Sequence, residues 1–200
     1  MSEKFKVLVA DPPWKFGDKL PGPNRGAESN YSCLTVKELC EFPIPEMQPD
    51  SWLFLWRVSA MPEEALQVVR AWGFVPKTEL IWAKRTKNGK RWFGMGHQVR
   101  AEHETCIIAT RGSPKVLNRN TRSIFEAAYT GHSRKPDEFY ELVEKLCPGP
   151  IAELFARRPR DGWTTFGNQL PADQGFMSAP GVPLPDSQDY DYEEGELDCE

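Results

Sequence analysis

The sequence has 200 residues, of which 40% are hydrophobic and 12% aromatic, and it carries a net charge of −4. This composition can bury the core of one ordinary domain, so it excludes a wholly disordered chain and leaves no room for two independent cores. The longest apolar runs are far shorter than a membrane span and no secretory leader is evident, so we expect a cytoplasmic protein without a membrane partner.

The predicted strands are short apolar runs. They lie at about residues 5–10, 51–57, 79–83, 104–110 and 151–156. Most of these runs are apolar on both faces, which is typical of strands in a largely parallel sheet that helices cover.

Helix signals lie between these strands. Thr35 and Glu38 have the spacing of a capping box, and Pro43 should end the short helix that it opens. Pro62 begins a second helix, and Pro136 begins a third whose apolar residues recur at i, i+3, i+4 and i+7. Helices that alternate with buried strands predict an α/β fold with a largely parallel sheet and helices on both faces.

The acidic residues gather near the end of the chain. Residues 171–200 contain nine of the 29 acidic residues and no Lys or Arg, so residues 1–170 contain 25 basic and 20 acidic residues. The last 30 residues also lack a periodic apolar face. We therefore expect one folded domain over residues 1–170 and an acidic disordered tail over residues 171–200. The mildly basic domain is compatible with a polyanionic partner.

Cysteine and histidine spacing gives no metal site. The five cysteines are widely spaced without a C-x-x-C pair, and the three histidines do not form an H-E-x-x-H motif. Such cysteines suit reduced thiols in a cytosol, and we expect no bound metal.

The candidate catalytic segment is Asp11-Pro12-Pro13-Trp14, directly after the first predicted strand. Ligands of open α/β sheets bind at the carboxyl ends of strands, so this is where a site is expected. The two prolines have no N–H group and a fixed φ, so the segment offers hydrogen-bond acceptors, the Asp11 carboxylate and the Pro12 carbonyl, beside the flat Trp14 ring.

An acceptor edge next to an aromatic ring matches a planar group with an exocyclic amine, such as N6 of adenine. Hydrogen bonds from the amine to Asp11 and Pro12 would aim the nitrogen lone pair at an electrophile, and stacking on Trp14 would fix the plane of the base. The alternative is a plain turn after a strand, with Trp14 in the core.

Four groups of residues, in order, resemble motifs of an N6-adenine methyltransferase family. This family contains the catalytic subunit of the eukaryotic mRNA adenosine methyltransferase and its bacterial and phage DNA adenine methylase relatives. The groups are Asp11–Trp14; Tyr31 with Leu34 and Thr35; Arg100–Glu104 leading to Ala109–Gly112; and His132–Asp137 with Glu153–Arg157 and Trp163–Gln169. The resemblance covers about residues 5–170.

The resemblance implies a Rossmann-like class I methyltransferase fold, circularly permuted so that the catalytic motif precedes the cofactor-binding motif. It implies S-adenosyl-L-methionine as the cofactor and Asp11, Pro12, Pro13 and Trp14 as catalytic residues. The implied cofactor-binding residues are Asp11, Lys135, Glu153, Arg157, Asn168 and Gln169. Lys135 resembles the family's lysine near the methionine carboxylate, and a lysine before a helix suits that role.

One segment departs from the family pattern. Between Arg157 and Trp163 the chain is shorter than the eukaryotic subunit, so that subunit's histidine and asparagine contacts have no counterpart here. Arg158, Arg160 and Asp161 are candidates only.

The implied substrate is adenine in DNA, flipped out of its duplex, because the compact chain resembles the bacterial and phage members. The expected substrate-binding residues are Tyr31, Lys84, Arg85, Lys87, Arg91 and His103. The basic ones among residues 84–91 would contact phosphates, although a solvated hairpin tip would look the same. Methylation of RNA adenosine and a noncatalytic nucleic-acid-binding subunit are the alternatives, and the sequence does not distinguish a monomer from a homodimer.

Overall fold

The computed structural model describes residues 4–15, 33–94, 98–131, 134–167 and 170. Within these residues a seven-stranded sheet has the order β5-β3-β4-β2-β1-β6-β7. The strands are β1 (Phe5–Ala10), β2 (Met47–Arg57), β3 (Val75–Arg85), β4 (His103–Arg111), β5 (Ile124–Ala128), β6 (Ile151–Leu154) and β7 (Trp163–Phe166). The helices are α1 (Val36–Glu41), α2 (Pro62–Ala71) and α3 (Asp137–Leu146).

The sheet is largely parallel, as predicted. Strand β1 pairs in parallel with β2 and β6, and β6 with β7. Strand β4 runs antiparallel to both β2 and β3, and β3 pairs in parallel with β5. The start of β4 therefore lies at the same edge of the sheet as the carboxyl ends of its neighbours.

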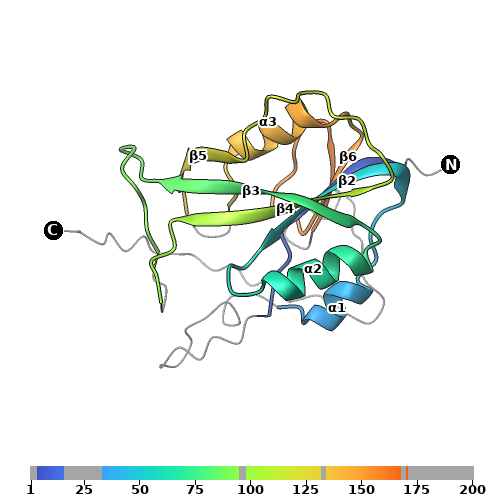
Figure 1. Cartoon of the computed structure of the whole chain (residues 1–200), viewed down its shortest axis with the longest axis horizontal. Helices are drawn as coiled ribbons and strands as arrows, with labels where there is room; N and C mark the ends of the chain where they lie inside the picture. The colour runs from blue at the N-terminus through green and yellow to red at the C-terminus, as the bar shows by residue number, and fades with distance from the viewer. Residues whose placement is uncertain (1–3, 16–32, 95–97, 132–133, 168–169, 171–200) are drawn as a thin grey trace.

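Helices cover both faces of the sheet, with α3 above it and α1 and α2 below it in Figure 1. Side chains alternate between the faces along each strand. Leu8 and Ala10 of β1 pack in the core on the α1 and α2 side, whereas Val7 and Val9 pack with Phe139 of α3. This alternation directs the next side chain, that of Asp11, to the α3 face.

The helix boundaries follow the predicted signals. Thr35 caps α1, and the reciprocal Thr35 and Glu38 hydrogen bonds of the capping box are both present. Pro62 is the first residue of α2, and α3 begins directly after Pro136. None of the described helices is long and apolar enough to cross a membrane.

Two strands, β5 and β7, were not predicted from the sequence. Strand β5 is largely exposed at one edge, with Ile124 58% exposed, and β7 forms the opposite edge. Both lack the continuous apolar run that marks a buried strand. Residues 84 and 85 belong to the end of β3, so Lys84 and Arg85 lie in a strand and not at a hairpin tip.

The ends of β6 and β7 approach each other closely at Gly167. A Cβ atom at Gly167 would lie 1.9 Å from the carbonyl oxygen of Ala156. We expect Gly167→Ala to lower the free energy of unfolding by about 1–3 kcal/mol, because the backbone must move to make room. Urea unfolding checks this result. Thr164→Ala, on the exposed side of β7, should change stability by about 0.5 kcal/mol or less, and an equally small loss in Gly167→Ala would contradict the prediction.

Candidate active site

The candidate site lies where the chain leaves β1 and β6 in opposite directions. Ala10 of β1 pairs with Leu154 of β6, so Asp11 and Phe155 follow neighbouring strands. From β1 the chain proceeds to β2 on one side, and from β6 to β7 on the other. Such a topological switch point is where open α/β sheets bind ligands. Phe155 has a φ of 63°, and strained residues of this kind gather at functional sites.

The segment after β1 is held in place by its own backbone and by Trp14. The Trp14 N–H donates to the Pro12 carbonyl at 2.9 Å, and the Leu34 N–H donates to the Pro13 carbonyl at 2.7 Å. Trp14 is 5% exposed and its indole Nε1–H donates to the Trp56 carbonyl at 3.0 Å. This placement corrects the expected stacking surface: protein covers the Trp14 ring, which instead anchors the segment to the end of β2.

Four charged side chains form a row along this edge of the sheet. The Lys135 Nζ atom lies 2.6 Å from Asp11 Oδ2 and 3.1 Å from Glu104 Oε2. The other oxygen of Glu104, Oε1, lies 2.6 Å from the Nζ atom of Lys84. Two cations thus alternate with two carboxylates, and their formal charges cancel. We call Asp11, Lys135, Glu104 and Lys84 the charged row.

Burial and neighbouring charges have opposite effects on the pKa values of Glu104 and Lys135. Burial acts to raise the pKa of Glu104. This pKa nevertheless lies below its ordinary value, because Lys135 and Lys84 stabilise the carboxylate. Burial acts to lower the pKa of Lys135, but Asp11 and Glu104 raise it overall. Lys135 is therefore a buried ammonium at neutral pH, and its Nζ atom also lies 4.9 Å from the centroid of the Trp56 ring.

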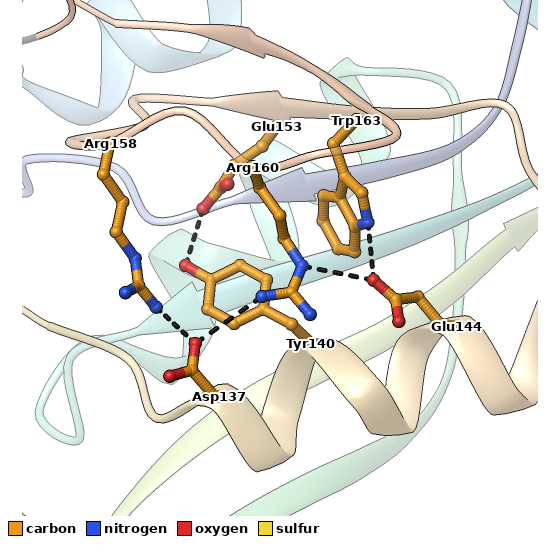
Figure 2. A network of polar contacts seen from close by, with 7 residues as sticks. All are labelled: Asp137, Tyr140, Glu144, Glu153, Arg158, Arg160 and Trp163. Atoms are coloured by element: carbon orange, nitrogen blue, oxygen red, sulfur yellow. Dashed lines mark hydrogen bonds and ion pairs between the residues drawn. The ribbon is translucent and has the colours of Figure 1, made fainter.

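A second polar network joins α3 to the segment after β6 (Figure 2). The Tyr140 hydroxyl donates to Glu153 Oε1 at 3.0 Å. Arg158 and Arg160 both contact the Asp137 carboxylate, at the first turn of α3. Arg160 also donates to Glu144 at 3.1 Å. These contacts hold the short segment between β6 and β7 against the helix.

A hollow in the protein surface lies beside this second network. It is lined by Asp137, Glu144, Arg158, Pro159, Arg160 and Asp161. Neither Asp11 nor Lys135 lines it, so we place the candidate active site at the charged row and not at this hollow.

Glu153 is buried in the second network. Burial raises the pKa of its carboxyl to about 7, even though the Tyr140 hydroxyl bond acts in the opposite direction. Because the pKa is higher in the folded chain than in the unfolded chain, the stability from Glu153 is present in acid and is lost as the pH rises toward 7. We expect Glu153→Gln to stabilise the protein more at pH 8 than at pH 5, by up to about 3 kcal/mol. Urea unfolding at both pH values checks this, and an equal effect at both would contradict it.

The expected phosphate-binding residues do not share one environment. Lys84 is 8% exposed and paired with Glu104, so its position argues against the predicted phosphate contact. Arg85 pairs with Glu126, and Arg91 lies 3.8 Å from Glu102.

Some of the remaining sequence-predicted residues are described by the structure and the others are not. Lys87 and His103 are exposed, and Arg157 is half-buried. Tyr31, Asn168, Gln169 and the whole tail of residues 171–200 lie outside the described residues. Asp11 and Lys135 are brought into direct contact, as a shared site requires.

Of the neighbouring His103 and Glu104, the sequence assigns His103 to substrate binding, whereas the structure brings Glu104 into the site. Alternation along β4 places Glu104 on the α3 face with Cys106 and Ile108, which belong to the core on that side. Extending this alternation back from the buried strand would have identified Glu104. The contact of Trp56 with Lys135 has no signal in the sequence around Trp56.

The chain is similar to known methyltransferases over most of its described residues. The sequence profile of the MT-A70 family matches residues 5–169. The chain is 34% identical over 173 residues to the N(6)-adenosine-methyltransferase catalytic subunit METTL3 of Homo sapiens, covering 84% of this chain and 28% of that protein. It is 27% identical over 191 residues to the type II methyltransferase M.MunI of Mycoplasma sp, covering 84% of this chain and 79% of that protein.

Proposed function

The chain belongs to the MT-A70 family, and from this premise we propose that it transfers a methyl group from S-adenosylmethionine to the N6 amine of adenine in DNA. S-adenosylmethionine is the methyl donor of MT-A70 methyltransferases. The chain spans only 28% of the METTL3 proteins that it matches, so its own activity and substrate are part of the proposal.

The residues at the switch point fit this cofactor. An ammonium suits the carboxylate of the methionine part, and Lys135 supplies one within 2.6 Å of Asp11. Glu153 has its Oε1 atom held by Tyr140, which leaves Oε2 for a ribose hydroxyl, and Arg157 follows on the same segment. We propose that Asp11, Lys135, Glu153 and Arg157 hold the cofactor, together with Asn168 and Gln169. When bound, the cofactor supplies an electrophilic methyl group on its sulfonium.

In the proposed reaction Asp11 binds and orients the adenine amine. Its Oδ2 atom is held by Lys135, so Oδ1 can accept an N6–H hydrogen bond. The Pro12 carbonyl accepts the Trp14 N–H and retains a second lone pair for the other N6–H. Methylation leaves one proton too many on the nitrogen, and the Asp11 carboxylate lies ready to accept it.

The observation that carries the proposal is the direct contact of Asp11 with Lys135 at the switch point, 124 residues apart in the sequence. A merely structural turn after β1 would not need a buried ammonium beside its carboxylate. The cation holds one oxygen of the Asp11 carboxylate and leaves the other as an acceptor for the amine substrate.

The similarity to a type II methyltransferase favours DNA as the substrate. The chain covers 79% of M.MunI, but less than a third of METTL3. RNA adenosine is the second candidate, because sequence identity is higher to METTL3 (34%) than to M.MunI (27%).

The test is to incubate the purified chain with methyl-labelled S-adenosylmethionine and either DNA or RNA, and to digest the product to nucleosides. We expect the label on N6-methyldeoxyadenosine. Label on N6-methyladenosine alone would transfer the proposal to RNA, and label on neither would overturn it.

A further inference from the structure

Lys84 is a buried lysine that the proposed reaction does not use. Its Nζ atom lies 4.5 Å, 4.7 Å and 5.1 Å from the ring centroids of Trp92, Tyr129 and Trp82. Its side chain is 9% exposed. Ring faces attract a cation, and more strongly when water is excluded. The three rings therefore form a cage that fixes the ammonium in one position.

Lys84 is set apart from the basic residues that follow it. Its ammonium is enclosed by rings and paired with Glu104, whereas the Arg91 side chain is 76% exposed. To reach a phosphate, Lys84 would have to leave both its carboxylate partner and its cage. Its surroundings match a role inside the protein.

The partner of Lys84 is the carboxylate that also holds Lys135. Glu104 gives Oε1 to Lys84 and Oε2 to Lys135, at 2.6 Å and 3.1 Å. Burial and the charge of this carboxylate both raise the pKa of Tyr129, and Asp11 is linked to the carboxylate through Lys135. Without Lys84, both oxygens of Glu104 would be free to attract Lys135 away from Asp11.

We infer that Lys84 is a positioning residue: by fixing one oxygen of Glu104 inside the aromatic cage, it keeps Lys135 shared between Glu104 and Asp11. The inference rests on the proposed function, in which Asp11 orients the adenine amine. Lys84 thus acts on Asp11 through Glu104 and Lys135, and it does not itself touch the reacting groups.

Steady-state kinetics test this role. In Lys84→Met we expect kcat to fall by about 10-fold to 100-fold, while KM for S-adenosylmethionine and for an adenine-containing oligonucleotide changes less than about threefold. Lys84→Arg keeps the cation and should restore kcat to within about threefold of the wild type. Lys77→Met, an exposed lysine of the same strand, is the control and should behave as the wild type.

An NMR titration tests the same role without methyl transfer. In cofactor-free protein labelled with 13C at glutamate Cδ, the Glu104 signal is the one missing from Glu104→Gln. We expect the pKa of Glu104 to rise by about one pH unit in Lys84→Met, because the carboxylate loses a neighbouring cation. Trp92→Leu opens the cage and should raise this pKa in the same direction, which keeps the test available if Lys84→Met does not fold.

Two results overturn the inference. If Lys84→Met raises KM for the oligonucleotide and leaves kcat unchanged, Lys84 contacts nucleic acid instead. If the Glu104 titration is the same in the wild type and in the variants, Lys84 does not act through Glu104. If the wild-type protein methylates neither DNA nor RNA, but the pKa of Glu104 rises in the variants as expected, the proposed function is overturned. The coupling of Lys84 to Glu104 then still stands.

Discussion

Replacing Asp11 with alanine should lower the rate of methyl transfer by about 100-fold to 1000-fold or more, the effect seen when a group that stabilises a transition state is removed. Asp11 is the carboxylate proposed to bind the N6 amine, and it lies 2.6 Å from Lys135. Asp11→Asn keeps the shape of the side chain but loses the charge, so it should be similarly impaired. The measurement is transfer of labelled methyl groups to an adenine-containing oligonucleotide.

The fold should survive both substitutions, because the Asp11 side chain is 24% exposed and follows β1 without pairing in it. Thermal unfolding checks that the variants are folded. Glu138→Ala removes an exposed carboxylate from the first turn of α3, and serves as the control with near-normal activity. Activity of Asp11→Ala within tenfold of the wild type would contradict the assigned role.

Signals that reside in the local sequence predicted the fold well. The capping box of Thr35 and Glu38 forms as expected, and β1 spans the predicted residues 5–10. The missed strands β5 and β7 lie at the two edges of the sheet. Edge strands need fewer apolar side chains, so their sequences resemble loops, and only pairing with a neighbouring strand identifies them.

The candidate site was predictable only in part, because its contacts join distant segments. The position of Asp11 follows from the carboxyl end of a strand, which the sequence reveals. The burial of Trp14 and the cage around Lys84 depend on which strands become neighbours. The motif residue Arg111 has a structural role, since its guanidinium donates to the Trp72 carbonyl at the end of α2 at 2.7 Å.

Removing the Lys135 ammonium should have the second large effect. In Lys135→Met, Asp11 and Glu104 lose the cation that lies 2.6 Å and 3.1 Å from their oxygens. We expect affinity for S-adenosylmethionine to fall by about tenfold or more, since the methionine carboxylate loses its counter-ion, and methyl transfer to fall by about 100-fold. Isothermal titration calorimetry measures the first effect and labelled transfer the second.

The same substitution should destabilise the cofactor-free protein by about 1–3 kcal/mol, because two partly buried carboxylates lose their shared partner. Loss of Lys135 also raises the pKa of Glu104, so protonation relieves the repulsion and the destabilisation should be smaller at pH 5 than at pH 8. Lys145→Met, an exposed lysine in the last turn of α3, is the matched control and should change neither affinity nor pH dependence. Unchanged calorimetric affinity in Lys135→Met would remove this lysine from the cofactor site, whereas a destabilisation independent of pH would contradict its electrostatic role between the two carboxylates.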